Sequence, residues 1–230
     1  MTPSSGTSGT LYLVPTPIGN LADFTPRAID VLRAVDYILA EDTRTTGKLT
    51  REFSIETPLK AFHQHNEHKA TPGWIQALRN GQSVAVCSDA GTPGLSDPAF
   101  LLVRACVDED IPVICLPGPT AFVPALVTSG IPCDRFVFEG FLPHKKGRQK
   151  RLALLAEEER TVVFYESPHR IVKLLQELEV HCGPDRWVAC SREISKLHEQ
   201  TVRGTVTDLI NHFTQHEPKG EFVVVVAGKE

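Results

Sequence analysis

The sequence has no apolar run close to the roughly 20 residues that a membrane-spanning helix needs. Its first stretch, 1–9, is small and polar, so it lacks the apolar core of a signal peptide. We therefore expect residues 1–9 to form a flexible tail, and we expect a cytoplasmic protein with no membrane partner.

Cysteines in metal-binding pairs are also missing. The chain has six cysteines, and no two of them form a Cys-x-x-Cys pair. Scattered thiols, three of them in apolar segments, are typical of reduced and buried cysteines rather than of zinc sites or disulfides. His63, His65 and His68 lie close together, but they lack helical spacing and a nearby cysteine ligand. We expect no metal.

Phosphate-binding signatures are absent too. No Walker-type loop occurs, and Pro15-Thr-Pro-Ile-Gly19 stands after the first expected strand in place of a Gly-x-Gly-x-x-Gly fingerprint. The net charge of −4 argues against a uniformly cationic coat for nucleic acid. A local basic patch is still compatible with this charge, and the segment 143–151 contains one.

Strand-like and helix-like patterns alternate along nearly all of the 230 residues. The expected strands are 11–14, 37–40, 58–62, 83–87, 111–116, 135–139, 161–165, 186–191, 200–204 and 222–227. The expected helices are 25–34, 45–53, 67–79, 98–107, 120–128, 147–158, 169–179 and 207–212. Strands that alternate with single helices predict parallel pairing, whereas 186–191 and 199–205 predict an antiparallel hairpin. The fold class is therefore α/β, with one domain at 10–117 around a mainly parallel sheet and another at 118–230 around a mixed sheet.

The loop Ser88-Asp-Ala-Gly-Thr-Pro-Gly-Leu-Ser-Asp-Pro98 joins a short buried strand to a helix. Glycines let a backbone approach a ligand closely, and Ser96 or Asp97 is placed to cap the helix that starts near Pro98. Loops at the carboxyl ends of strands hold the ligands of open α/β sheets. A tight connection without a ligand is the alternative, but this loop is longer than such a connection requires.

Six motifs occur in one order along the chain, and together they carry a resemblance. They are Leu11-Tyr-Leu-Val-Pro-Thr-Pro-Ile-Gly-Asn-Leu21, Ala40-Glu-Asp-Thr-Arg44, Ser88-Asp-Ala-Gly-Thr-Pro93, Leu116-Pro-Gly-Pro119, Phe138-Glu-Gly-Phe-Leu-Pro143 and Phe164-Tyr-Glu-Ser167. In this order they resemble the ribosomal RNA small-subunit methyltransferase I group of the tetrapyrrole methylase superfamily, over about residues 10–230.

The resemblance implies 2′-O-methylation of a cytidine ribose in the decoding region of 16S rRNA, with S-adenosylmethionine as cofactor. It also implies a homodimer, and two α/β domains with the cofactor in the cleft between them. Such a donor is a zwitterion with an adenosine, so its pocket needs backbone polar groups and apolar walls. By similarity, the cofactor-binding residues are Pro15, Ser88, Asp89, Ala90, Gly91, Thr92, Pro93, Thr120, Ala121, Tyr165 and Glu166. For Thr120 and Ala121 an ordinary helix start after Pro119 is the alternative.

Catalysis is expected from Asp42 and Arg44, which follow the second expected strand. Methyl transfer is an in-line displacement, and its barrier falls when the nucleophile and the methyl group are held close and aligned. A ribose hydroxyl is a poor nucleophile, so a base or a cation near it helps. Asp42 is placed to accept or orient the hydroxyl proton, and Arg44 to hold a phosphate or the developing oxyanion. The alternative is a helix N-cap with a surface ion pair. Which group deprotonates the hydroxyl, if any, stays open.

Substrate contacts are expected from polar residues at strand ends and from the basic segment: His65, Asn66, Lys145, Lys146, Arg148, Arg170 and Arg192. The segment 143–151 either neutralises phosphates or is a solvated helix start. Arg170 either contacts RNA or pairs with Glu166, and Arg192 either lines the mouth of the cleft or forms an ion pair. His65 and Asn66 either contact the substrate or belong to a solvated loop.

Two rival functions remain. One is methylation of a tetrapyrrole ring, and the other is a catalytically silent RNA-binding factor on the same fold. The motifs at 40–44 and 138–143 and the basic segment favour RNA. Many members of the group continue past the final strand with an extra helical segment, whereas this sequence stops soon after 222–228. The basic segment is then expected to contribute more to target binding.

Overall fold

The computed structural model describes residues 8–229, so most of the predicted tail 1–9 lies outside the described residues. Gly9 corrects the end of that tail. It is buried, and its N–H donates to the Leu78 carbonyl at 2.8 Å. A Cβ atom at Gly9 would lie 1.9 Å from the Gln82 carbonyl oxygen, so the chain is closely packed from this residue onward.

The chain divides into two compact units, Met1–Thr120 (unit 1) and Ala121–Glu230 (unit 2). The boundary predicted at residue 117 lies beside this division. Among the described residues, no helix is long and apolar enough to span a lipid bilayer.

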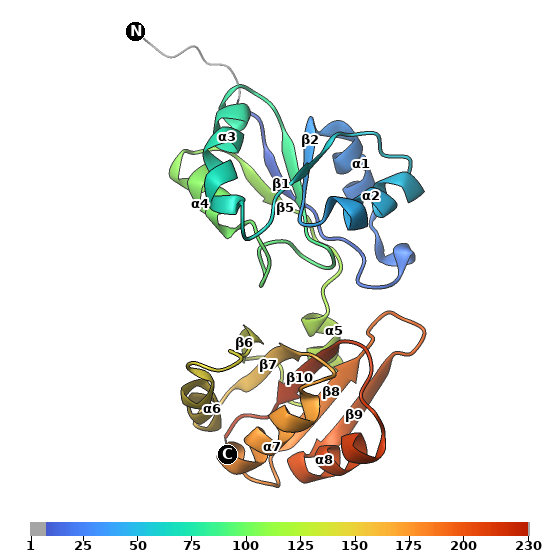
Figure 1. The fold of residues 1–230 in the computed structure, drawn as a ribbon, viewed down its shortest axis with the longest axis vertical. Coiled ribbons are helices and arrows are strands. Elements are labelled where there is room, and N and C mark those ends of the chain that lie inside the picture. The colour runs from blue at the N-terminus through green and yellow to red at the C-terminus, as the bar shows by residue number, and fades with distance from the viewer. Residues whose placement is uncertain (1–7, 230) are drawn as a thin grey trace. The chain divides into compact units, whose positions relative to one another are not determined.

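Unit 1 contains a five-stranded sheet in the order β3-β2-β4-β1-β5 (Figure 1), and every neighbouring pair is parallel. Its strands are β1 (Leu11–Leu13), β2 (Tyr37–Ala40), β3 (Leu59–Ala61), β4 (Val84–Cys87) and β5 (Val113–Cys115). Its helices are the 3-10 turn η1 (Leu21–Asp23), α1 (Pro26–Ala34), α2 (Thr43–Glu52), α3 (Glu67–Arg79) and α4 (Phe100–Asp108).

The core of unit 1 lies on both faces of this sheet, because successive side chains of a strand point to opposite faces. Val84 and Val86 pack with residues of α3 and α4, while Ala85 and Cys87 pack with residues of α1. Figure 1 shows the same layers, with α3 and α4 on one side of the sheet and α1 and α2 on the other. A central parallel strand must therefore be apolar throughout, as Val84–Cys87 is.

The start of α4 differs from the prediction that Ser96 or Asp97 caps it. The N-cap residue is Ala99, and it makes no side-chain cap hydrogen bond. Instead, Oε1 of the buried Glu67 in α3 accepts from the N–H groups of Ala99 and Leu101, at 3.0 Å each. A carboxylate from a neighbouring helix thus satisfies the first donors of α4, which a local cap would otherwise do.

Unit 2 contains a mixed sheet in the order β6-β7-β10-β8-β9, in which only β6 and β7 pair in parallel. Its strands are β6 (Phe136–Phe141), β7 (Thr161–Glu166), β8 (Trp187–Arg192), β9 (Gln200–Thr205) and β10 (Phe222–Val226). Its helices are α5 (Phe122–Thr128), α6 (Arg148–Ala156), α7 (Ile171–Cys182) and α8 (Val206–Gln215). Residues of α5 pack on one face, and residues of α6, α7 and α8 pack on the other.

The predicted α/β class, with a parallel first sheet and a mixed second sheet, is confirmed. The predicted hairpin is β8–β9, which pairs in antiparallel fashion. All six cysteines are free, and Cys87, Cys106 and Cys190 are buried as expected. Cys115 and Cys133 are exposed, which corrects the expectation of burial. Cys115 lies on β5, an edge strand of its sheet, where one side of the strand has no neighbour.

Candidate active site

The loops that follow the strands of unit 1 gather at one edge of its sheet. Because all five strands are parallel, their carboxyl ends meet there, which is the ligand-binding edge of open α/β sheets. In Figure 1 this is the lower edge of unit 1. The loops after β1, β2 and β4 contain the predicted residues Pro15, Asp42 and 88–93, and Arg44 follows in the first turn of α2. The sequence-predicted residues of unit 1 are therefore brought to a common edge.

The loop 88–93 is fixed to the loop after β1 by main-chain hydrogen bonds. The Thr16 N–H donates to the Gly91 carbonyl at 2.9 Å, and the Gly91 N–H donates to the Thr16 carbonyl at 3.0 Å. The Thr16 hydroxyl also donates to the Ser88 carbonyl at 3.1 Å. Gly91 has φ +80°, which a side chain would strain. Between these anchors Asp89 and Ala90 are exposed, so the tip of the loop is accessible.

Other predicted cofactor residues hold the same edge together. The Thr92 hydroxyl donates to the Pro119 carbonyl at 3.2 Å, joining the loops after β4 and β5. Pro15 is buried, and a Cβ atom at Gly118 would come within 2.7 Å of its Cβ. Pro93 is buried as well. These contacts leave little freedom in the loops and make the edge a rigid platform.

Thr120 and Ala121 are half-buried and precede α5. Ala121 is the N-cap residue of that helix and offers no side-chain cap hydrogen bond. Their placement is compatible with the helix-start interpretation, and their predicted contact with a cofactor stays a prediction.

Several carboxylates surround the tip of this loop. The Asp42 N–H donates to Oδ1 of Asp89 at 3.2 Å, and the Asp89 N–H donates to Oε2 of Glu41 at 3.3 Å. Burial first, and then the negative charges of Glu41 and Asp89, raise the pKa of Asp97 to about 7, and a hydrogen bond from Ser88 acts in the opposite direction. Burial also raises the pKa of Asp89. The edge is therefore electronegative and favours a cationic ligand.

Sequence reasoning missed Glu41 and Asp97 as members of this group. Glu41 lies within the motif 40–44. Its position directly after a buried strand is a sequence feature that indicates a site residue. For Asp97 the sequence predicts a helix cap. Its partial burial next to two other acids arises from how the loop folds, and nothing in the local sequence indicates it.

Asp42 and Arg44 form an ion pair at the start of α2. Asp42 is the N-cap residue, with Oδ1 accepting from the Arg44 N–H at 2.8 Å. Nη2 of Arg44 lies 2.6 Å from Oδ2 of Asp42. Hydrogen bonds from the Arg44 side chain, and then from its backbone, lower the pKa of Asp42 to about 2. The cap and ion pair are thus present, and they hold an 87% exposed Arg44 side chain at the ligand-binding edge.

The loop after β3 places His65 in solvent and turns Asn66 inward. The Asn66 side chain accepts from the His63 N–H at 2.8 Å and donates to the Ala61 carbonyl at 3.0 Å. Asn66 therefore shapes the loop, which leaves His65 as the accessible member of the predicted pair. The buried Nδ1 of His63 has no hydrogen-bond partner among residues 8–229. No metal-holding group of three His, Cys, Asp or Glu residues occurs in that range.

The basic segment of unit 2 contains one buried cation, and this corrects a prediction. Arg148 is 4% exposed, and its Nη2 lies 2.6 Å from Oε2 of Glu177 and 3.8 Å from Oε2 of Glu166. It also donates to the Pro143 carbonyl. Arg148 therefore holds α6 to α7 and is not available to an RNA phosphate, because its guanidinium is already enclosed by carboxylates.

Glu166 and Arg170 belong to the same network. Nε of Arg170 lies 2.8 Å from Oε1 of Glu166, which is almost fully buried. The Ser167 N–H donates to the same oxygen at 2.8 Å, and Arg170 also contacts the His144 ring. Of the two interpretations of Arg170, pairing with Glu166 is the one observed. The side chain of Glu166 is enclosed, so its main chain is the part that remains for a cofactor.

Two further predicted residues of unit 2 lie on strands, Tyr165 on β7 and Arg192 on β8. Nε of Arg192 donates to the Gln200 side chain at 2.8 Å across the β8–β9 hairpin. Within the described residues Arg192 thus forms a cross-strand hydrogen bond and not the ion pair that is the alternative interpretation, and its predicted contact with the substrate stays a prediction. The half-buried ring of Tyr165 packs against Phe138 and Phe141, with ring centroids 5.3 Å apart in each case.

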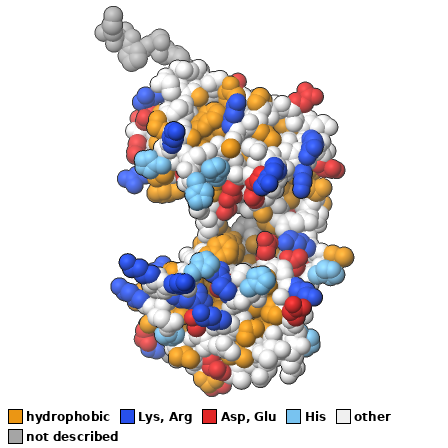
Figure 2. Space-filling model, viewed as in Figure 1, with side chains coloured by type: hydrophobic (Ala, Val, Ile, Leu, Met, Phe, Trp, Pro, Cys, Tyr) orange, Lys and Arg blue, Asp and Glu red, His pale blue; other side chains and the backbone are white. Residues whose placement is uncertain are grey.

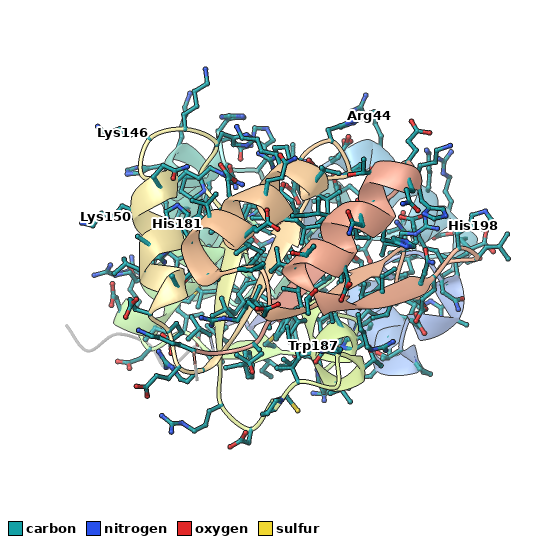
Figure 3. The ribbon with its side chains drawn as sticks, turned by 90° about the horizontal axis from the view of Figure 1, so that it is seen from below. Arg44, Lys146, Lys150, His181, Trp187 and His198 are labelled. Atoms are coloured by element: carbon teal, nitrogen blue, oxygen red, sulfur yellow. The ribbon has the colours of Figure 1, made fainter. Side chains whose placement is uncertain are left out.

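Lys145 and Lys146 are exposed, as the predicted RNA contacts require. Figure 2 shows Lys and Arg side chains gathered on the α6 side of unit 2, and Figure 3 shows Lys146 and Lys150 pointing outward there. Lys150, absent from the predicted set, joins this basic surface from the first turn of α6.

The chain is similar to known methyltransferases over most of its length. The sequence profile of the tetrapyrrole (corrin/porphyrin) methylases matches residues 10–210. The ribosomal RNA small subunit methyltransferase I of Synechocystis is 52% identical over 96% of this chain and 79% of its own length. The Escherichia coli O157:H7 relative of that name is 46% identical over 98% and 80%. The Thermotoga maritima relative of that name is 46% identical over 96% of this chain and 100% of its own length.

Solved structures show the same fold. A cobalt precorrin-4 methyltransferase has TM-score 0.67 and 18% identity, covering 95% of this chain and 94% of its own. A uroporphyrin-III C-methyltransferase from Thermus thermophilus, complexed with S-adenosylhomocysteine, has TM-score 0.63 and 18% identity, covering 95% and 97%. Because the profile and these relatives match nearly the whole sequence, the chain belongs to the ribosomal RNA small subunit methyltransferase I family, within the tetrapyrrole methylases.

Proposed function

We propose that the chain transfers a methyl group from S-adenosylmethionine to the ribose 2′-hydroxyl of a cytidine in the decoding region of 16S rRNA. The relatives named above are ribosomal RNA methyltransferases with nearly half or more of their matched residues identical. The single observation that carries the chemistry is the electronegative loop tip, where Asp89 and Ala90 are exposed between residues fixed by main-chain hydrogen bonds.

The residues at this edge fit such a donor. When bound, S-adenosylmethionine supplies an electrophilic methyl group on a positively charged sulfur. The carboxylates of Glu41, Asp89 and Asp97 favour a cation beside them, and the pKa values of Asp89 and Asp97 are raised first by burial and then by the neighbouring negative charges. The residues that would hold the donor are Pro15, Ser88, Asp89, Ala90, Gly91, Thr92, Pro93, Thr120, Ala121, Tyr165 and Glu166.

Arg44 orients the RNA in this proposal. Its guanidinium is exposed and is fixed by Asp42, so it is available for a phosphate or for negative charge that develops on the ribose oxygen. Asp42, with a pKa of about 2, is a weak proton acceptor. Its role is therefore to position Arg44 rather than to deprotonate the hydroxyl.

The test is a methylation assay with isolated small ribosomal subunits and radiolabelled donor. We expect label on a cytidine ribose of 16S rRNA, located by nuclease digestion and mass spectrometry. A parallel reaction with a porphyrinogen tests tetrapyrrole methylation, the activity of the fold's more distant relatives. Ring methylation without label on RNA would overturn the proposal. Calorimetry that detects subunit binding but no donor binding would indicate a silent RNA-binding factor.

The proposal includes a cytoplasmic homodimer, since the target is the ribosomal subunit and the family implies a dimer. Exposed apolar side chains support a self-contact: Val123 and Val127 on α5 are 43% and 66% exposed. Burying such side chains against a second copy is favourable. Light scattering after gel filtration is expected to give twice the chain mass, and Val127→Glu to shift it toward the monomer. A monomeric wild-type protein would exclude the dimer.

A further inference from the structure

We infer that a hollow between β6 and α6 binds an unpaired nucleotide of single-stranded RNA, with the base on Phe141 and a neighbouring phosphate at Lys150. The inference rests on the proposed function and specifies the form of RNA that unit 2 recognises. It assigns individual roles to Phe141, from the motif 138–143, and to Lys150, from the basic segment 143–151, which the sequence analysis treats only as parts of longer stretches.

The hollow has a volume of about 470 Å³ and combines apolar with cationic walls. Its lining residues are Glu139, Phe141, Pro143, Gly147, Lys150, Arg151 and Leu154. Phe141 and Leu154 are each 56% exposed, although both are large apolar side chains. Exposed aromatic rings beside cations are the usual surface on which single-stranded nucleic acids stack their bases.

The backbone of β6 aims Phe141 into this hollow. The pairing of β6 with β7 shifts register between Phe138 and Gly140, and Gly140 has φ +61°. Such a bulge redirects the side chains that follow it. Phe141 then packs against Tyr165 in a tilted arrangement, with 5.3 Å between ring centroids and 52° between the ring planes, which restricts its ring on one side. A braced ring loses little freedom when a base covers it.

One cation that lines the hollow has a side chain without a partner. Within residues 8–229, Arg151 pairs with Glu139 and Arg148 is enclosed, but the ammonium group of Lys150 makes no ion pair or hydrogen bond. The side chains of Lys145 and Lys146, outside the hollow, are exposed and equally unpaired within that range. Figure 3 shows Lys146 and Lys150 directed away from the ribbon. Unpaired lysines on a chain of net charge −4 mark a local site for phosphate.

Unpaired RNA fits this surface better than a duplex. Base faces in a helix are stacked on one another, so a duplex would use the lysines and leave the ring bare. The two contacts therefore leave different signatures. Stacking on Phe141 affects affinity at every salt concentration, whereas a phosphate contact at Lys150 affects the dependence of affinity on salt.

The test measures binding of the full-length protein to a fluorescent single-stranded RNA of about eight nucleotides, a length that single-strand binding sites cover. We expect Phe141→Leu to weaken binding about tenfold while the salt dependence stays unchanged. Phe141→Trp keeps an aromatic face and should bind as the wild type does. Lys150→Gln should reduce the slope of log affinity against log salt by about 0.7.

Matched controls separate these effects from general damage. Trp187→Leu removes another exposed aromatic ring of unit 2, and Lys173→Gln removes another exposed lysine outside the hollow. Neither should change binding to the single strand. Binding to a duplex of the same sequence should be insensitive to Phe141→Leu. Equal binding by Phe141→Leu and the wild type, or equal losses in Phe141→Leu and Trp187→Leu, would overturn the inference.

Failure of this inference and failure of the proposed function give different results. If wild-type protein labels 16S rRNA and Phe141→Leu binds and labels as well as the wild type, only the nucleotide site is wrong. If wild-type protein labels no RNA, the proposed function is wrong, whatever Phe141→Leu does to oligonucleotide binding.

Discussion

Asp42 and Arg44 are joined twice at the start of α2. One oxygen of Asp42 accepts from the Arg44 backbone at 2.8 Å, and the other lies 2.6 Å from Nη2 of the same residue. The carboxylate that caps the helix therefore also fixes the direction of the guanidinium. Capping and substrate orientation are roles of one side chain, so variants of the two residues should separate stability from activity.

Arg44→Ala is expected to lower the rate of RNA methylation about a hundredfold, as removal of one oxyanion donor does. It should leave the free energy of unfolding nearly unchanged, because the ion pair is exposed. Asp42→Ala should lower the free energy of unfolding through loss of the cap and should also lower the rate. Single-turnover assays and urea denaturation measure the two effects. Arg51→Ala on the same helix is the control, and a rate equally low in Arg51→Ala would remove Arg44 from the site.

Gly91→Val is expected to abolish measurable donor binding. Its φ of +80° strains any branched side chain, and the two hydrogen bonds with Thr16 depend on that conformation. Isothermal titration with S-adenosylmethionine measures the loss. Gly73→Ala is a matched control, because Gly73 lies within α3 and a Cβ there would meet nothing within 4 Å. It should raise stability by about 0.5–1 kcal/mol and leave affinity unchanged. Donor affinity retained in Gly91→Val would show that the loop is misassigned.

The sequence predicts those features that local pattern determines. The run Val84–Cys87 is apolar on both faces, so a central strand follows from it directly. Because parallel strands end at one edge, the loop 88–93 could also be placed beside the loop after β1. The order of the six motifs along the chain is specific enough to indicate the family from the sequence alone.

Other features depend on partners far away along the chain and leave no local signal. Arg148 lies in a run of exposed cations, and only its contact with Glu177, 29 residues away, encloses it. Glu67 caps a helix that begins 33 residues later. In both cases tertiary packing determines which one of several similar polar residues is buried, and the sequence pattern does not indicate which one.

The enclosed position of Arg148 gives a prediction about stability. Arg148→Met leaves the carboxylate of Glu177 without its partner and should cost about 3–5 kcal/mol. Combining it with Glu177→Leu removes both charges and should recover part of that loss. Lys146→Glu, two residues earlier and exposed, should stay within about 0.5 kcal/mol of the wild type. Chemical denaturation compares them. An Arg148→Met protein as stable as Lys146→Glu would return Arg148 to the set of RNA-binding candidates.

Asp97 gives a prediction about pH. Burial first, and then the charges of Glu41 and Asp89, raise its pKa in the folded protein to about 7, from 3.8. Between these values the folded state holds a proton that the unfolded state has released, so the contribution of Asp97 to stability falls as pH rises through this window. Above about pH 7 both states are ionised and the contribution stays constant.

Asp97→Asn carries no titrating group, so its free energy of unfolding should fall less than that of the wild type between these pH values. Urea denaturation at several pH values measures both proteins. Identical pH dependences would mean that the Asp97 carboxyl is not held in a buried, acidic environment, and the electronegative character assigned to the loop edge would lose its main support.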